Sequence, residues 1–465
     1  APMIAGSVVQ ILYNLVDTYF IGRLNDANQL AAANLSMPIF MSIMAMTNMV
    51  AIGAASYISR KLGAKEMEKA ENALNMAVIF YFGIAFTVTA CGTLMLKKLV
   101  PLLGASSLTA PYVYDYCLVL VCGCTASIFN FGFSQLVRAE GGSLQAFFGM
   151  GIGAVVNIIL DPVFIFVFDM GVRGAALATV IGNLCSALFY LTCYLTKRNM
   201  LRLNLRRVRF DGPTAAEIFK VGLPTTMNQL LMTFSSVFSN NIVASYGESY
   251  VAATGVVMKT MSISNFVIMG LANGCQPLLG YCYGAKNMTR LKDILKKTYF
   301  IGVMLGVAFF GMFSIFASSI IQFFINDAQV IEVGCKLISR MILTLPFLTI
   351  LMTNTSALQA MGKALPAMIL SVSRQGLLYV PLMYFLNRFF GYDGFICTVP
   401  ITDFIMIFLS IGMTTTVIRK SGKLFESETL LEMESSQESY QETYVEKARR
   451  GVVPSEEPQD SCIAE

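Results

Sequence analysis

The sequence contains no histidine and few charges: only 13% of its 465 residues are Asp, Glu, Lys or Arg. Without histidine there is no Ser-His or Cys-His pair to activate a nucleophile, and a zinc site would need cysteine thiolates alone. Ten of the eleven cysteines lie in or beside apolar runs, which is typical of small buried side chains. The G-x-x-x-x-G-K phosphate loop is also absent, so an internal ATPase is not expected.

Apolar residues dominate the chain instead. Hydrophobic residues make up 55% of it and the mean hydropathy is +0.64, whereas soluble proteins average about 25% charged residues. The uncharged runs, of about 20 residues each, are long enough to cross a bilayer as helices, and they do not alternate as membrane strands do. We predict an all-α polytopic membrane protein with twelve transmembrane helices, at residues 2–23, 30–58, 74–96, 112–137, 144–168, 173–196, 218–246, 251–281, 298–323, 333–359, 364–388 and 394–418.

Lysine and arginine are distributed unevenly between the two sets of loops. Twenty-one lie in the loops after even-numbered helices and at the start of the tail, against five in the opposite loops. Cytoplasmic loops of membrane proteins are enriched in these two residues. We therefore expect the even-numbered loops and both chain termini to be cytoplasmic.

The two halves of the sequence repeat the same motifs. The tripeptide "GAK" at residues 63–65 recurs at 284–286, and "RAEG" from Arg138 pairs with "QAMG" from Gln359, both at an offset of 221 residues. The offset covers six predicted helices, an even number, so the repeats have the same orientation in the membrane. We predict an amino-terminal lobe with helices 1–6 (1–196), a basic cytoplasmic linker (197–217), a carboxy-terminal lobe with helices 7–12 (218–423) and an acidic cytoplasmic tail (424–465).

The linker and the tail carry opposite charge. Residues 197–213 hold six bases and one acid, a pattern that favours contact with anionic membrane lipids, with no nucleic acid expected as a partner. After Lys423 there are eleven carboxylates, including four Glu at four-residue spacing from Glu434 to Glu446. We expect this tail to be solvated, and partly helical or disordered.

Two acidic residues lie at one depth inside the predicted helices. Asp17 stands six residues before the first helix ends at Arg23, and Asp161 stands seven residues before the fifth helix ends at Phe168. At 1.5 Å per residue, both are about 9–10 Å below the outer edge of the membrane. No basic residue of the same half lies at that depth. Because an ionised residue inside a membrane is energetically unfavourable, the pair indicates a functional site.

Polar side chains accompany these two acids. Asn157 lies one turn before Asp161 on the same helix face, and Thr179 reaches a similar depth on the sixth helix. Two carboxylates, an amide and a hydroxyl suit either proton exchange or a hard cation such as Na⁺. We predict a cation-coupling site at Asp17, Asn157, Asp161 and Thr179. Pro162 removes a backbone donor beside Asp161, which predicts a hinge in the fifth helix.

Other polar and charged residues in the predicted helices are candidates for contact with a transported molecule. We expect Arg374 and Asp403 to form a structural ion pair, whereas Lys259 has no evident partner. Gln10 and Asn14 extend a polar stripe that ends at Asp17. The candidates for contact with a substrate or the cavity are Gln10, Asn14, Asn183, Asn240, Lys259, Arg374 and Asp403.

At these residues the chain resembles the multidrug and toxic compound extrusion (MATE) family. The matching segments run in family order between Pro2 and about Arg419. They are "LVDTYFIG" in the first helix, "GAK" after the second and eighth, "RAEG" after the fourth, "NIILDPVF" in the fifth and "GVRGAALAT" at the start of the sixth. The resemblance implies two six-helix lobes in a V shape around a central cavity, with the positions of Asp17, Asn157, Asp161 and Thr179 as the cation site of the amino-terminal lobe.

The resemblance also implies a function. It favours a secondary active antiporter, without a cofactor, that exports amphiphilic organic cations in exchange for H⁺ or Na⁺. We expect a monomer in a bacterial plasma membrane. Two alternatives remain open at this point: a flippase for a lipid-linked glycan, which would need a strongly basic cavity, and a membrane-embedded aspartyl enzyme, which would need paired Asp but no alternating access.

Overall fold

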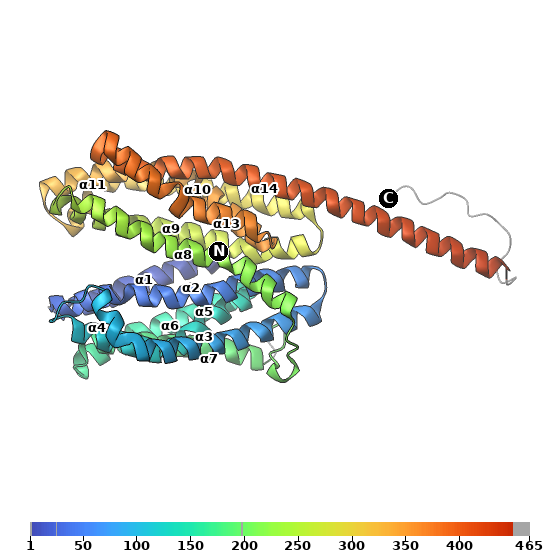
Figure 1. Ribbon diagram of the computed structural model, residues 1–465, viewed down its shortest axis with the longest axis horizontal. Coiled ribbons are helices and arrows are strands. Elements are labelled where there is room, and N and C mark those ends of the chain that lie inside the picture. The colour runs from blue at the N-terminus through green and yellow to red at the C-terminus, as the bar shows by residue number, and fades with distance from the viewer. Residues whose placement is uncertain (1, 25, 197–198, 450–465) are drawn as a thin grey trace. The chain divides into compact units, whose positions relative to one another are not determined.

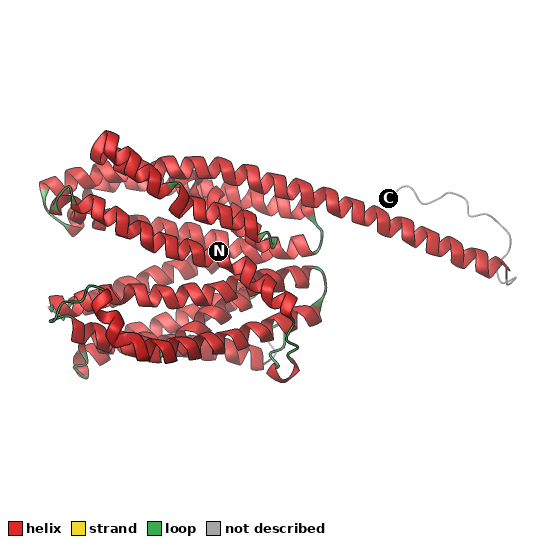
Figure 2. Ribbon diagram, in the orientation of Figure 1, coloured by secondary structure: helices red, strands yellow, loops and turns green. Residues whose placement is uncertain are grey.

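The computed structural model describes residues 2–24, 26–196 and 199–449, and every regular element in them is helical (Figure 2). Figure 1 follows the chain from α1 to α14. The first half contains α1 (Pro2–Gly22), α2 (Ala27–Gly63), α3 (Met67–Leu102), α4 (Ala110–Cys122), α5 (Cys124–Ala139), α6 (Ser143–Pro162), the π-helix η1 (Val163–Val167) and α7 (Gly171–Leu195).

The second half begins with the 3₁₀-helix η2 (Leu205–Arg207) and continues, within the described residues, with nine further helical elements. These are α8 (Gly212–Ala244), α9 (Glu248–Gly284), α10 (Met288–Phe324), α11 (Ala328–Met341), the 3₁₀-helix η3 (Ile342–Thr344), α12 (Leu345–Ala360), α13 (Ala364–Val372), the π-helix η4 (Ser373–Leu377) and α14 (Tyr379–Arg449). We call α1–α7 the amino-terminal lobe, and α8–α14 up to Thr414 the carboxy-terminal lobe.

These helices account for the twelve predicted membrane spans. Among the described residues, nine helices are long and apolar enough to cross a membrane, or ten when α4 and α5, bent by 53° at Gly123, count as one span. The eleventh is α8, which follows the predicted seventh span but is less apolar. The twelfth arises because the segment Ala364–Glu428 is interrupted at Gly391, whose φ of 59° and ψ of −142° are not helical and which separates the last two predicted spans.

Several helices extend beyond the predicted apolar spans because polar residues continue them as far as a cap. Asp26 accepts a hydrogen bond from the Asn28 N–H and begins α2, three residues before the predicted start. Asp211 accepts one from the Thr214 N–H and begins α8 at Gly212, inside the predicted linker. Of that linker, residues 197 and 198 lie outside the described residues.

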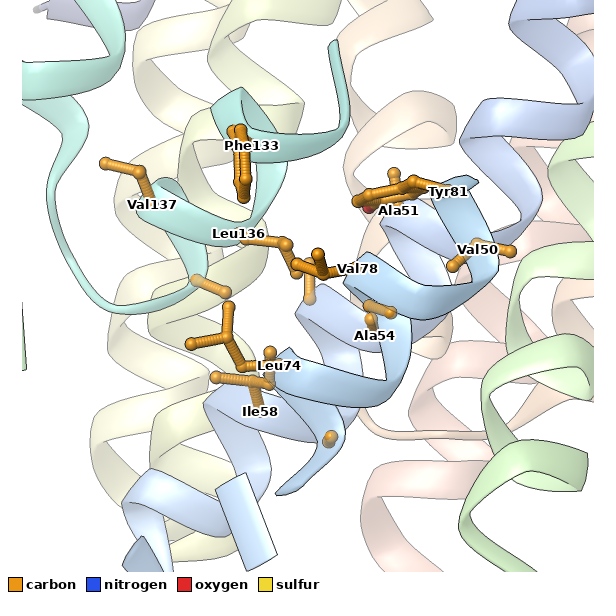
Figure 3. Packing of buried hydrophobic residues seen from close by; sticks show 14 of the residues in the cluster. Val50, Ala51, Ala54, Ile58, Leu74, Val78, Tyr81, Phe133, Leu136 and Val137 are labelled. Carbon is orange, nitrogen blue, oxygen red and sulfur yellow. The ribbon is translucent and has the colours of Figure 1, made fainter. Parts of the chain in front are cut away.

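The core of the amino-terminal lobe lies between α2, α3 and α5. Figure 3 shows side chains of the three helices meeting, with Ile58 from α2, Leu74 and Tyr81 from α3, and Leu136 from α5. Small residues let the helices approach closely: a Cβ on Gly132 of α5 would lie 2.5 Å from the Tyr81 ring. Such packing is the main source of helix association in a membrane, where lipid tails are as apolar as leucine.

The two lobes meet where α2 crosses α8 and α9. At each crossing a glycine of one helix lies against the backbone of the other: a Cβ on Gly53 would stand 1.9 Å from the Ile218 carbonyl oxygen, and a Cβ on Gly284 would stand 1.9 Å from the Arg60 carbonyl oxygen. The contacts are reciprocal, because a Cβ on Gly222 would stand 1.7 Å from the Met49 carbonyl oxygen and a Cβ on Gly63 would stand 2.0 Å from the Tyr281 carbonyl oxygen.

Polar contacts reinforce these crossings. Arg60 of α2 and Glu217 of α8 form an ion pair of 2.7 Å, and the Ser56 hydroxyl donates to the Gln359 carbonyl oxygen of α12. All of these contacts lie toward the helix ends that carry Lys65, Lys286 and Lys363, which we call the basic end of the protein. Residues up to Thr414 belong to one compact unit, and the part of α14 from Thr415 to residue 449 belongs to a second.

Candidate functional site

Asn157, Asp161 and Thr179 come together inside the amino-terminal lobe. Asp161 is fully buried and Asn157 is 1% exposed, both on α6, while Thr179 faces them from α7. The side-chain amide of Asn157 donates to Asp161 Oδ1 at 3.2 Å and to Thr179 Oγ1 at 3.4 Å. The i, i+4 spacing of Asn157 and Asp161 places the two side chains on one helix face, as the sequence predicted.

Helix α1 supplies the second carboxylate. Asp17 is half-buried, and it is close enough to Asp161 for their charges to interact. One turn earlier, Tyr13 shares a hydrogen bond of 3.4 Å with Thr179 and so ties α1 to α7. Tyr116 of α4 lies within electrostatic range of both carboxylates. The sequence reasoning missed the two tyrosines, although the spacing of Tyr13 four residues before Asp17 was a usable signal.

Three oxygens of this cluster have no hydrogen-bond donor among the described residues. They are Asp17 Oδ1, Asn157 Oδ1 and Asp161 Oδ2, and all three are buried. Buried polar atoms in proteins are normally hydrogen-bonded, and an unpaired buried carboxylate is strongly unfavourable. Acceptors without donors are satisfied by a proton or by a hard cation, and carboxylate, amide and hydroxyl oxygens are the ligands that hard cations prefer. The residues present therefore fit both candidate coupling ions.

The helix changes form directly after Asp161. Helix α6 ends at Pro162, and residues 163–167 continue as a π-helix in which the Phe168 N–H donates to the Val163 carbonyl at 2.9 Å. Proline has no N–H to donate to the preceding turn, which explains why the regular ladder stops there. Short π-helical segments occur often at functional sites. The predicted hinge at Pro162 thus coincides with a local change of helix type.

The candidate Asn183 takes part in a separate hydrogen-bond chain. Its side-chain oxygen accepts from Asn130 at 2.7 Å, and its amide donates to Ser127 at 2.9 Å. Both partners belong to α5, so Asn183 connects α5 to α7 within the amino-terminal lobe. This contact set explains the residue as a helix–helix link, one turn from Thr179 on α7.

Three other candidates lie on α1 and α8. Gln10 is half-buried, Asn14 is exposed, and Asn240 is exposed on α8. Asn240 stands eighteen residues, or five turns, beyond Gly222, the glycine that contacts α2. It therefore occupies the α2-facing side of α8 at the end of the helix away from the basic end.

The carboxy-terminal lobe contains the predicted ion pair. Arg374 Nε of η4 lies 2.9 Å from Asp403 Oδ1 of α14, and the Arg374 side chain is 18% exposed while that of Asp403 is 5% exposed. The Thr344 hydroxyl donates to the second oxygen of Asp403 at 3.4 Å. Lys259 differs from these residues, because it is exposed on α9 and has no hydrogen bond or ion pair with any described residue.

Comparisons with known proteins agree with this architecture. The family model MatE matches the chain twice, at residues 2–163 and 224–385, so the matches begin 222 residues apart. The multidrug export protein MepA of Staphylococcus aureus is 30% identical over 403 residues, which cover 86% of this chain and 89% of the relative.

Solved structures are similar over nearly the whole chain. The crystal structure of a MATE protein in complex with MaL6 has a TM-score of 0.87 and 25% identity, and covers 91% of this chain and 95% of its own. An outward-facing multidrug resistance MATE transporter of the MOP superfamily has a TM-score of 0.85 and 26% identity over the same shares. The predicted all-α polytopic fold is confirmed. The alternative interpretation as a membrane-embedded aspartyl enzyme is wrong, because the family consists of transporters. The chain belongs to the MATE family of transporters, as its sequence motifs predicted.

Proposed function

We propose that this chain is a secondary active antiporter of a bacterial plasma membrane that exports amphiphilic organic cations in exchange for H⁺ or Na⁺. Membership of the MATE family supports transport, and similarity to the multidrug export protein of Staphylococcus aureus supports export of more than one drug. We expect the protein to act as a monomer surrounded by membrane lipids.

The observation that carries the proposal is the group of three buried oxygens without donors, Asp17 Oδ1, Asn157 Oδ1 and Asp161 Oδ2. A bound cation or proton neutralises such a group, and its loss restores repulsion between the two carboxylates. The helices α1, α6 and α7 that hold the group therefore pack differently in the two charge states, and η1 after Pro162 provides a weak point for that change.

The direction of transport follows from the helix crossings and the charge bias. The lobes touch at the basic end, and we expect this end to face the cytoplasm because Lys and Arg are enriched there. With that orientation, the contacts between the lobes support a conformation that is closed to the cytoplasm. In the proposed cycle, cation uptake from outside disfavours the bound drug and releases it there, and cation loss to the cytoplasm restores the drug-accepting form.

A flippase for a lipid-linked glycan receives less support. Recognition of a pyrophosphate headgroup needs several free cations in the cavity. The bases well inside the predicted spans are Lys259, Lys336, Arg340 and Arg374. Of these, Arg374 pairs with Asp403, and Lys336 pairs with Asp393 at 2.6 Å. The described residues therefore offer no cluster of unpaired bases of the kind that such a headgroup requires.

Equilibrium binding of a fluorescent organic cation to the purified protein tests the proposal. Linkage requires that drug affinity falls when the pH is lowered or Na⁺ is added, because the ion and the drug favour different conformations. In Asp161→Asn that dependence is expected to shrink toward zero even when the dye still binds. Asp169→Asn, the same substitution at an exposed position eight residues later, is the matched control and should keep the full dependence. Equal dependence in Asp161→Asn and wild type would remove Asp161 from coupling.

A further inference from the structure

Lys259 is an exposed base inside a membrane-spanning helix. It lies eleven residues after Glu248, the first residue of α9, which places it about 16 Å along the helix. No described residue gives it an ion pair or a hydrogen bond. A lysine at this depth either extends along the lipid to the headgroups or faces a water-filled cavity between helices. The position of Lys259 on its helix distinguishes these two cases.

The contacts of α9 identify which of its faces is turned toward the other lobe. A Cβ on Gly270 would stand 2.2 Å from the Ser7 hydroxyl oxygen of α1, and a Cβ on Gly274 would stand 3.1 Å from the Met3 Cβ. Lys259 precedes Gly270 by eleven residues, which is three helical turns. Lys259 therefore lies on the same face of α9 as Gly270 and Gly274, which pack on α1 nearer the basic end. This face is not turned to lipid.

The face of α1 that packs on α9 near the basic end is also exposed further along the helix. Asn14 follows Met3 by eleven residues, and Thr18 follows Ser7 by eleven. Both Asn14 and Thr18 are exposed, although the residues three turns below them contact α9. Two helix faces that touch near the basic end are thus both exposed further along. This pattern shows that α1 and α9 diverge away from the basic end, with Lys259 on one wall of the resulting space.

The two walls carry opposite charge at one level. Thr18 and Lys259 each stand three turns beyond the contact between Ser7 and Gly270, and Asp17 adjoins Thr18. Asp17 and, behind it, Asp161 make the α1 side acidic, while Lys259 makes the α9 side basic. A molecule with only a positive charge is attracted by one wall and repelled by the other. A molecule with charges of both signs matches both walls.

We propose that Lys259 selects, among the compounds this protein exports, amphiphiles that carry an anionic group in addition to their cationic one. The amine of such a zwitterion faces the Asp17 side, and its carboxylate pairs with the Lys259 ammonium. This assignment rests on the export function proposed above and names its preferred substrate class. Since the pair forms in a hydrated space, its contribution is that of an exposed ion pair, which corresponds to a difference in affinity of at most about fivefold.

A matched pair of dyes tests this assignment on the purified full-length protein. A rhodamine with a free carboxylate is a zwitterion, and its methyl ester is a cation with the same ring system. Fluorescence anisotropy gives the dissociation constant of each dye, and the ratio of the two constants measures the preference for the carboxylate. In Lys259→Gln we expect the preference to fall by up to about fivefold relative to wild type, and in Lys259→Arg we expect it to be kept.

The control is Lys292→Gln, which removes the same charge from an exposed site on α10 near the basic end. Its ratio should equal that of the wild type. An unchanged ratio in Lys259→Gln, or an equal fall in Lys292→Gln, would overturn the role of Lys259 while leaving the export function in place. Failure of both dyes to bind the wild type would overturn the export function, and this proposal with it.

Discussion

In the amino-terminal lobe one oxygen of the buried Asp161 has no donor among the described residues, whereas in the carboxy-terminal lobe Arg374 and Thr344 occupy both oxygens of Asp403. The two lobes share a repeated fold, so the difference lies in side chains rather than in helix arrangement. A carboxylate that is already paired gains little from a proton or a cation, while an unpaired one gains much. The comparison therefore favours the amino-terminal lobe as the part that responds to ions.

A second pair of equivalent positions differs in the same sense. Glu140 follows Arg138 in "RAEG", and Met361 takes its place in "QAMG". Glu140 is 9% exposed and accepts hydrogen bonds from the Tyr194 hydroxyl at 2.7 Å and from the Leu201 N–H at 3.1 Å. Burial raises the pKa of Glu140 from 4.5 to about 7. Met361 is buried and cannot titrate, so the equivalent position of the carboxy-terminal lobe lacks this response to pH.

The largest expected effect is on transport. Asp17→Asn and Asp161→Asn should each reach the membrane in normal amounts but lose at least about tenfold in dye efflux from energised cells, because neither leaves a pair of carboxylates to hold the coupling ion. The double variant Arg374→Met/Asp403→Leu removes the pair of the other lobe and should keep most of the efflux. Efflux at wild-type rates from both Asp variants would show that the unpaired carboxylates are not required.

The next prediction compares how much a substitution at the acidic residue's site in each lobe changes the stability of the protein. Arg374→Met alone leaves Asp403 buried without its partner and should destabilise the protein by about 3–5 kcal/mol. Asp161→Asn removes a charge that already lacks an ionic partner, so it should destabilise the protein by less than about 1 kcal/mol. Unfolding in detergent with increasing denaturant measures both. Replacing the whole pair, as in the double variant, should recover most of the loss, and a double variant as unstable as Arg374→Met would contradict this account.

The third prediction concerns the pH dependence of stability. The folded protein binds the Glu140 proton more tightly than the unfolded chain, so this stabilising contribution is complete below about pH 4.5 and is lost as the pH rises to about 7. The change amounts to at most about 3 kcal/mol. Glu140→Gln should flatten that part of the curve measured between pH 4.5 and 8. Met361→Leu is the control at the equivalent position and should leave the slope as it is.

The smallest effect is expected from the acidic tail. Residues 426–465 lie outside both repeats, so a chain truncated after Phe425 should export dye at the wild-type rate. The measurement compares efflux per inserted protein in the two strains. A clear loss of efflux from a correctly inserted truncated protein would mean that the tail takes part in the transport cycle.

Much of the fold was predictable because it depends on composition alone. Uninterrupted apolar runs identified the spans, and equal depth on two helices brought Asp17 and Asp161 to one level before any contact was known. The helix ends were less predictable, since polar residues extend α2 and α8 to caps at Asp26 and Asp211 that hydropathy does not detect.

The remaining features of the site depend on which helices are neighbours. Tyr13 looks like any aromatic residue of a membrane helix until α7 is known to lie beside it. The same holds for Asn183, because its position on α7 does not predict that it forms hydrogen bonds with α5. The sequence showed that Lys259 has no evident partner, but the direction it faces follows only from the contact of Gly270 with Ser7.

The reciprocal glycine contacts between α2 and its neighbours α8 and α9 have an evolutionary consequence. At Gly53, Gly63, Gly222 and Gly284 there is no side chain to enlarge or to trim, and every other residue adds at least a Cβ within 2.0 Å of a facing carbonyl oxygen. Mutation at these codons can therefore only push the lobes apart at the basic end. Under selection for export of new drugs, substitutions that adjust the equilibrium between conformations will arise at other positions. These four sites allow no small change in side-chain size.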